Sequence, residues 1–454
     1  MLDLYYQNWE RAPFDASTKA IESWISGKNT PNPKTFDAFL RSAELFPDSV
    51  RKTLWQLYKV SDDGSSQQAK QSPTDDRDFE LIRKIVDVIG TFGTKQLNPR
   101  DAEGLIKQIR EIARHQMSDE QARYADFYIK LALIPLYRGL GQIDDLMDML
   151  QELEAEIQST PELSDVLKGS FYHHRGVIRC YIQGDYQNAI LDYQEAHQFF
   201  QLTDHVCDVA GVLVDIGMAH WCAGDLRSAE LLIEKGHKQA KSNHCSETYL
   251  IATGNLGLVN LTRGKLEEAL PLIQQHFELA VTFHHDKEMV RAQSNRGIVY
   301  FFMERYAEAF NDLTHDARNA KGQTEGLSLA YAYIGMCHLK MNDIRKARQC
   351  TEEALWIAEK NNLTHAKISA LRAMAECAMN STSARGYLQE ALELAKGSTI
   401  YQEAACQLSL GRILSDPEEA EAYFQQGREK LERMGGGAWI KSPNREDAPF
   451  IMMV

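Results

Sequence analysis

An all-α fold made of stacked helical hairpins is predicted by three observations on this 454-residue sequence. Gly217, Gly257 and Gly297 are each followed twelve residues later by an alanine, and the small residues at both positions let two antiparallel helices approach closely. The three alanines stand 40 residues apart, and a fixed period of that size is typical of a helical-hairpin array. Gly224-Asp225 and Gly264-Lys265 lie between the glycine and the alanine, where each hairpin must turn.

The alanine position recurs over most of the chain. It is occupied by Leu146, Ala189, Ala229, Ala269, Ala309, Ala347, Ala384 and Ala420, at intervals of 43, 40, 40, 40, 38, 37 and 36 residues. The period shortens toward the C-terminus, so we expect the last two hairpins to lose about one helical turn. Shortened terminal repeats are typical of caps, because each hairpin must otherwise bury its apolar face on a neighbour.

The stretch Gly184-Asp185-Tyr186, with Ala189, Tyr193 and Ala196, resembles the tetratricopeptide repeat (TPR). The 40-residue spacing is similar to the long-helix variant of peptide-binding and regulatory members. The resemblance covers roughly residues 120 to 434 and implies a right-handed superhelical solenoid. Such repeats mostly bind partners and carry no chemistry of their own.

The chain divides into five predicted segments. Residues 1–60 form a small helical domain, and 61–78, rich in Ser, Gln, Gly and Pro, form a flexible linker. Residues 79–118 supply two entry helices, and 119–434 form about eight hairpins. Residues 435–454 are expected to be an extended tail, with Trp439 and Phe450-Ile451-Met452-Met453 as docking residues.

Residues 17–31 combine an N-cap, a short helix with Ile21 and Trp24 on one face, and a Gly-terminated end. This stretch resembles the recognition helix of phage-repressor-type (XRE-type) helix-turn-helix domains. The resemblance implies major-groove contacts from Ser17, Thr18, Lys19, Glu22 and Ser23, and phosphate contacts from Lys28 and Asn29. Two features differ from that family: few residues precede Ser17, and Glu22 places an acid at a base-contacting position. The alternative is a helical cap or dimerisation module. A DNA-binding head would have to act as a homodimer that reads two half-sites.

In such solenoids the first helix of each hairpin lines a concave groove. In the long-helix families the Asn two residues before the helix glycine often clasps a bound peptide backbone, and Asn255 and Asn295 match that position. An amide can both donate and accept, so it satisfies a peptide backbone without reading side chains. The alternative is that these amides bond neighbouring helices. The predicted peptide-binding residues are Arg175, Asp215, Asn255, Asn295, Tyr333 and Lys340; other inner positions include Met218, Trp221 and Phe302.

Charge and cysteine usage limit the classes of partner. The net charge is −14, with about +1 on residues 1–60 and −15 on the rest, so the repeats would repel nucleic acid and anionic membranes. The eight cysteines lack a Cys-x-x-Cys motif and are interpreted as helix-packing residues in a reducing cytoplasm. No run of eighteen apolar residues occurs and the first residues do not begin a signal peptide, so a cytoplasmic protein is expected.

Chemistry is not expected. The glycines lie at hairpin turns and not in a phosphate-binding loop, and His173-His174 and His284-His285 have no ligands at metal-like spacing. We therefore expect no enzyme, metal or cofactor. A helix-turn-helix followed by long TPR hairpins resembles the peptide-pheromone receptors of Gram-positive bacteria and the phage communication receptors. That resemblance implies a ligand- or peptide-responsive regulator of transcription. The alternative is a scaffold that binds a protein partner and no DNA.

Overall fold

The computed structural model describes residues 119–319, 324–396 and 399–441, and in these ranges every regular element is helical. The predicted all-α fold class is therefore confirmed. The predicted segments 1–60, 61–78 and 79–118 lie outside the described residues, and so do the predicted DNA contacts from Ser17 to Asn29. The chain forms two compact units, Met1–Leu167 and Lys168–Val454.

The described part of the first unit is one hairpin of α7 (Asp119–Leu140) and α8 (Ile143–Ser159). Leu146, which takes the alanine position here, is fully buried. Lys130 of α7 reaches Glu152 at 3.1 Å and Glu156 at 3.5 Å, and so ties the two helices together.

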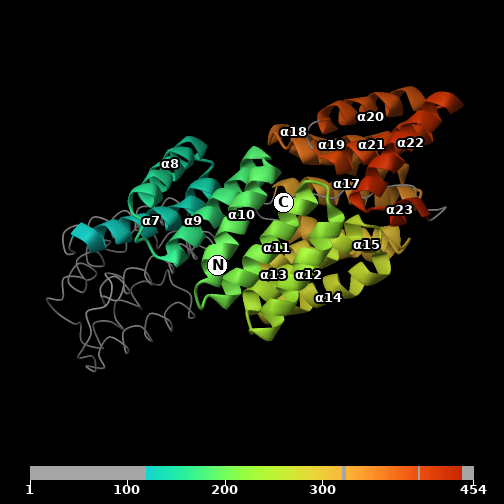
Figure 1. The fold of residues 1–454 in the computed structure, drawn as a ribbon. Helices are drawn as coiled ribbons and strands as arrows, with labels where there is room; N and C mark the ends of the chain where they lie inside the picture. Colours follow the sequence, from blue (N-terminus) through green and yellow to red (C-terminus); the bar gives the residue numbers. More distant parts are fainter. Residues whose placement is uncertain (1–118, 320–323, 397–398, 442–454) are drawn as a thin grey trace, which may run out of the picture. The chain divides into compact units, whose positions relative to one another are not determined.

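In the second unit, helices alternate between a first (A) and a second (B) helix of each hairpin, and each B helix from α12 to α20 packs on the A helices before and after it (Figure 1). The A helices are α9 (Asp165–Ile178), α11 (Val206–Cys222), α13 (Ser246–Thr262), α15 (Asp286–Phe302), α17 (Thr324–Lys340), α19 (Thr364–Glu376) and α21 (Ile400–Ile413). The B helices are α10 (Tyr186–Gln201), α12 (Leu226–Ser242), α14 (Leu266–Thr282), α16 (Tyr306–Asn319), α18 (Ile344–Lys360), α20 (Ser381–Ala395) and α22 (Pro417–Met434).

The glycine and alanine spacing acts as the sequence predicts. A Cβ on Gly217 would lie 2.5 Å from Ile233 Cγ1 and 3.1 Å from the Ala229 carbonyl oxygen, so only glycine lets α11 approach α12 this closely. Gly257 has the same relation to Ile273, at 2.7 Å. Ala229 is fully buried, as are its counterparts Ala189, Ala269, Ala309 and Ala347.

The turns follow a second local rule. Gly184 and Gly224 end their A helices with positive φ, a conformation that glycine adopts at little cost. The next residue, Asp185 or Asp225, caps the B helix, because its carboxylate accepts a backbone N–H three residues later. The Gly-Asp pairs of the sequence therefore stop one helix and start the next.

The first hairpin of the second unit contains an irregularity that the sequence did not reveal. Residues Arg179–Gln183 form a π-helix, η3, at the end of α9. The extra residue places Gly176, not Val177, against Tyr193 of α10, where a Cβ would meet the ring at 2.7 Å. The register of α9 is therefore shifted by one residue relative to the later A helices.

The A helices of the last two hairpins are shorter, as expected, whereas the B helix α22 keeps 18 residues. Helices α19 and α21 have 13 and 14 residues, whereas α11, α13 and α15 have 17 each. Beyond α22, the structure differs from the extended tail of the sequence prediction. Ala438–Lys441 form a turn of helix, α23, and Trp439 is 1% exposed. The remaining tail residues lie outside the described residues.

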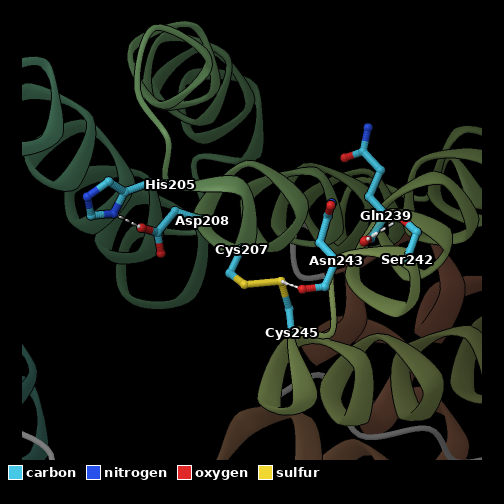
Figure 2. The surroundings of a disulfide bond; sticks show 7 residues. All are labelled: His205, Cys207, Asp208, Gln239, Ser242, Asn243 and Cys245. Carbon is cyan, nitrogen blue, oxygen red and sulfur yellow. Dashed lines mark hydrogen bonds and ion pairs between the residues drawn. A yellow bond between two sulfur atoms is a disulfide. The ribbon is translucent and has the colours of Figure 1, made fainter.

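The cysteine interpretation is wrong for one pair. Cys207 and Cys245 form a disulfide that joins the start of α11 to the start of α13 (Figure 2). Both residues stand at the beginning of an A helix, and stacking one hairpin on the next brings these beginnings together. The other six cysteines are free, and five of them are buried packing residues as predicted: Cys180, Cys222, Cys337, Cys377 and Cys406.

Candidate functional site

The candidate site is the row of side chains that successive A helices present at equivalent positions. We call this row the A-helix face; it comprises Asp215 of α11, Asn255 of α13, Asn295 of α15, and Tyr333 and Lys340 of α17. Asp215, Asn255 and Asn295 stand 40 residues apart. The polar character of this row contrasts with the rest of α13, which is buried on almost every side.

Arg175 does not belong to this row, because η3 shifts the register of α9. Its guanidinium turns toward α10 and forms a bidentate pair with Asp192, at 3.1 Å from Nε and 2.7 Å from Nη2. Arg179 Nη1 adds a third hydrogen bond to the same carboxylate at 2.7 Å. Asp192 is buried, so this cluster holds α9 on α10 through charges removed from water.

Asp215 links two repeats. Its carboxylate lies 2.8 Å from Nε2 of His173, one of the histidines of the His173-His174 pair. Both side chains keep about 30% of their surface exposed. The contact joins α9 to α11 and leaves the carboxylate accessible from one side.

Asn255 is buried and takes part in a polar network that sequence reasoning missed. Its side-chain oxygen accepts a hydrogen bond from Arg291 Nη1 at 2.8 Å, and Arg291 also pairs with Glu288. Glu288 in turn accepts from Nε2 of the fully buried His276, at 2.8 Å. Gly254 makes room for this network, since a Cβ there would lie 2.7 Å from His276 Nδ1.

The ionisation of this network follows from its burial. Burial is the main reason why the pKa of His276 is lowered, so the ring is neutral and donates its Nε2–H. Burial alone would raise the pKa of Glu288, but the Arg291 guanidinium and the His276 hydrogen bond outweigh it and lower that pKa to about 2. Asn255 of α13 therefore contacts a fixed arginine–carboxylate pair of α15. For this residue the alternative interpretation holds, in which the amide bonds a neighbouring helix.

A pH experiment should detect this carboxylate. Because the folded pKa of Glu288 lies below the ordinary value of 4.5, its contribution is present above that value and is lost as the pH falls toward 2. The stability advantage of the wild type over Glu288→Gln should therefore shrink by about 2 kcal/mol between about pH 6 and about pH 3. Urea unfolding at both values measures it. Glu278→Gln, which changes an exposed carboxylate of α14, should show no such change.

The remaining predicted residues differ in accessibility. Asn295 is half-buried, and within the described ranges its amide has no hydrogen-bond partner. Lys340 is exposed at the end of α17 and has no ion-pair partner among the same residues. Tyr333, in contrast, is fully buried and packs edge-on against Phe301 and Phe302. Asn295 and Lys340 are therefore the members of the A-helix face whose polar groups have no partner among the described residues.

An aromatic site lies at the C-terminal ends of α11, α13 and α15. Trp221 Nε1 donates to Thr262 Oγ1 at 2.9 Å, and Trp439 Nε1 donates to the Thr262 carbonyl oxygen at 2.8 Å. Phe302 meets the Trp439 ring edge-on with centroids 4.9 Å apart. The sequence placed Trp221 and Phe302 on the inner face; Thr262 was missed, because a threonine at the end of an apolar helix gives no signal.

Among residues 119–319, 324–396 and 399–441, no group of three or more His, Cys, Asp and Glu side chains is arranged to hold a metal ion. His284 follows α14 with positive φ and His285 caps α15, so this pair stands at a loop between hairpins. None of the helices in these ranges has the length and apolarity needed to cross a membrane.

Comparison with known proteins shows the fold. No family model and no curated protein matches the sequence. A Rap protein complexed with Competence and Sporulation Factor is 14% identical with a TM-score of 0.57, over 79% of this chain and 99% of that one. The apo form of the quorum sensor NprR from B. thuringiensis is 14% identical with a TM-score of 0.56, and the match covers 78% of this chain and 99% of that one. Aspartyl phosphate phosphatase F from Bacillus subtilis is 16% identical with a TM-score of 0.51, and the match covers 82% of this chain and 98% of that one. NprR has also been solved in complex with its cognate peptide NprX, with 14% identity to this chain and a TM-score of 0.56, over 77% of this chain and 99% of that one. The chain thus has the TPR-type helical-repeat fold of these proteins.

Proposed function

We propose that this protein is a peptide-responsive regulator that binds an extended peptide along the A-helix face and has no catalytic activity of its own. The observation that carries the proposal is the half-buried Asn295, whose amide has no hydrogen-bond partner within the described residues. An available amide at that position can donate to and accept from a peptide backbone. One of the solved structures with this fold, NprR, contains its cognate peptide NprX, which supports the same class of ligand.

Asn295→Ala should weaken peptide binding about tenfold, which corresponds to one lost hydrogen bond of about 1.4 kcal/mol. The ligand is unidentified, so a random peptide library displayed on phage is panned against the full-length protein, and selected peptides are titrated by calorimetry. Asn295 is changed alone, because Asn255 is bonded to Arg291 and its loss would disturb the fold. Asn311→Ala, at an exposed position of α16, is the matched control. A library without enriched peptides, or peptides that bind all three proteins equally, would contradict the proposal.

The regulatory output is proposed to be transcription, through residues 1–60. The support is the helix-turn-helix resemblance of residues 17–31, whose proposed contacts are Ser17, Thr18, Lys19, Glu22, Ser23, Lys28 and Asn29. Since residues 1–60 carry a charge near +1, one copy should bind DNA poorly, and a homodimer on two half-sites is part of the proposal. A gel shift of the intact protein on the DNA upstream of its own gene distinguishes this regulator from a scaffold that binds no DNA.

A cytoplasmic location is also proposed, and the Cys207–Cys245 bond gives it a specific consequence. Disulfides are rare in that compartment, because glutathione and thioredoxin keep thiols reduced. Cys207 is exposed and accessible to a thiol, whereas Cys245 is buried. In the cytoplasm this bond would form only under oxidising conditions.

A further inference from the structure

The chain's own C-terminal segment lies against the aromatic site of the A helices. Gly435, the C-cap of α22, accepts a hydrogen bond from Arg263 Nε at 3.4 Å, and Trp439 lies 177 residues along the chain from its partner Thr262. Figure 1 shows α23 next to α15, in agreement with the contact between Trp439 and Phe302. The segment Gly435–Lys441 thus crosses the turn ends of α13 and α15.

The site that receives Trp439 fits an indole in shape and in hydrogen bonding. The ring is almost completely buried, and its single polar group, Nε1–H, is satisfied by the Thr262 carbonyl oxygen. Gly264 lies at the base of the site with φ of +79°, and a Cβ there would stand 3.0 Å from the Trp439 backbone nitrogen and 3.1 Å from its ring. An indole that donates one hydrogen bond and packs edge-on against another aromatic ring is the kind of anchor that dominates peptide interfaces.

The connection to this anchor is built to let it move. Three glycines, Gly435, Gly436 and Gly437, separate α22 from α23, and a Cβ at Gly437 would meet no atom within 4 Å. A run of glycines loses much conformational entropy when it is ordered, which weakens the docking of whatever follows. The N–H groups of Gly435 and Gly436 are bound to the carbonyl oxygens of Glu432 and Leu431 in the C-cap of α22, so Trp439 can leave its site by rotation about Gly437 while α22 stays in place.

We propose that Gly435–Lys441 is an intramolecular pseudo-ligand, and that the Trp439 site is the anchor subsite for a peptide partner that carries a tryptophan. This inference rests on the proposed peptide binding, since it specifies tryptophan as the peptide side chain that the A helices recognise. The occupant in cis competes with the peptide in trans, so the partner must displace α23 in order to bind. Peptides without an indole cannot fill this subsite, so they do not displace the tail and do not bind.

The test uses the full-length protein and a labelled peptide of the chain's own segment, GGGAWIK. Trp439→Ala empties the site, so it should bind this peptide at least tenfold more tightly than the wild type does, by fluorescence anisotropy. The peptide GGGAAIK should not bind to either protein. Trp439→Phe, which keeps the ring and loses the indole N–H, should give an intermediate affinity and serves as the second variant if Trp439→Ala does not fold. Circular dichroism confirms the fold of each.

Two results separate the inference from the proposed function. If folded Trp439→Ala or Trp439→Phe binds GGGAWIK no better than GGGAAIK, Trp439 is a structural cap and the inference is overturned, even where library peptides still depend on Asn295. If GGGAWIK binds as expected but Asn295→Ala changes nothing, the anchor subsite stands and the role of Asn295 in peptide binding fails.

Discussion

Asp192→Ala should lower the free energy of unfolding by about 3–5 kcal/mol, because it leaves two guanidinium groups without their common carboxylate. Arg175 and Arg179 both reach Asp192 within 2.7 Å, and the carboxylate is only 3% exposed. Removing one partner of a buried ion pair costs more than the pair itself contributes, since the remaining charges stay desolvated. Urea unfolding followed by circular dichroism gives the value from the midpoint and slope.

The control for this variant is Asp208→Ala. Asp208 also pairs with a basic side chain, His205, at 2.8 Å (Figure 2), but half of the Asp208 side chain is exposed. Exposed pairs contribute about 0–1 kcal/mol, so the control should change little. Equal effects at the two positions would mean that water screens the Asp192 cluster, and that packing alone holds α9 on α10.

Gly217→Ala should cost about 1–3 kcal/mol, whereas the same exchange at Gly386 should stabilise the protein by about 0.5–1 kcal/mol. Both glycines lie within helices. The added methyl group at Gly217 would enter the space of Ile233, a fully buried side chain, while at Gly386 no atom lies within 4 Å. Thermal unfolding of the two variants measures effects of opposite sign.

The same test extends to the next hairpin. Gly257 faces Ile273 as Gly217 faces Ile233, so Gly257→Ala should lose a similar amount. If Gly217→Ala and Gly386→Ala shifted the midpoint of thermal unfolding alike, Gly217 would act only through its backbone freedom. Close contact between helices would then not explain the repeat pattern.

The repeat architecture could be predicted because its cause is local and recurs. Gly217 and Ala229 belong to one hairpin, so their spacing directly records how α11 packs on α12, and the recurrence 40 residues later shows that hairpins stack. The Gly-Asp turns are equally local, since positive φ and an N-cap involve adjacent residues. Such features leave a pattern in the sequence.

The candidate site was less accessible to sequence reasoning, because its contacts are non-local or depend on an irregularity. One additional residue in η3 turns Arg175 from the inner face toward Asp192. Tyr333 occupies the same repeat position as Asn295 but is buried by the aromatic side chains of α15. The Trp439 site depends on a hydrogen bond between Trp439 and Thr262, which lie 177 residues apart, and no periodicity in the sequence links them.

The Cys207–Cys245 bond has a mechanical consequence. If the two ends of the chain are pulled apart, the loop between these cysteines stays closed, so their separation of 38 residues adds nothing to the extended length. About 130 Å of contour is withheld at about 3.4 Å per residue. Helices α11 and α12 therefore extend under force only after a thiol has opened the bond, and the redox state of one cysteine pair sets how far this protein can be stretched.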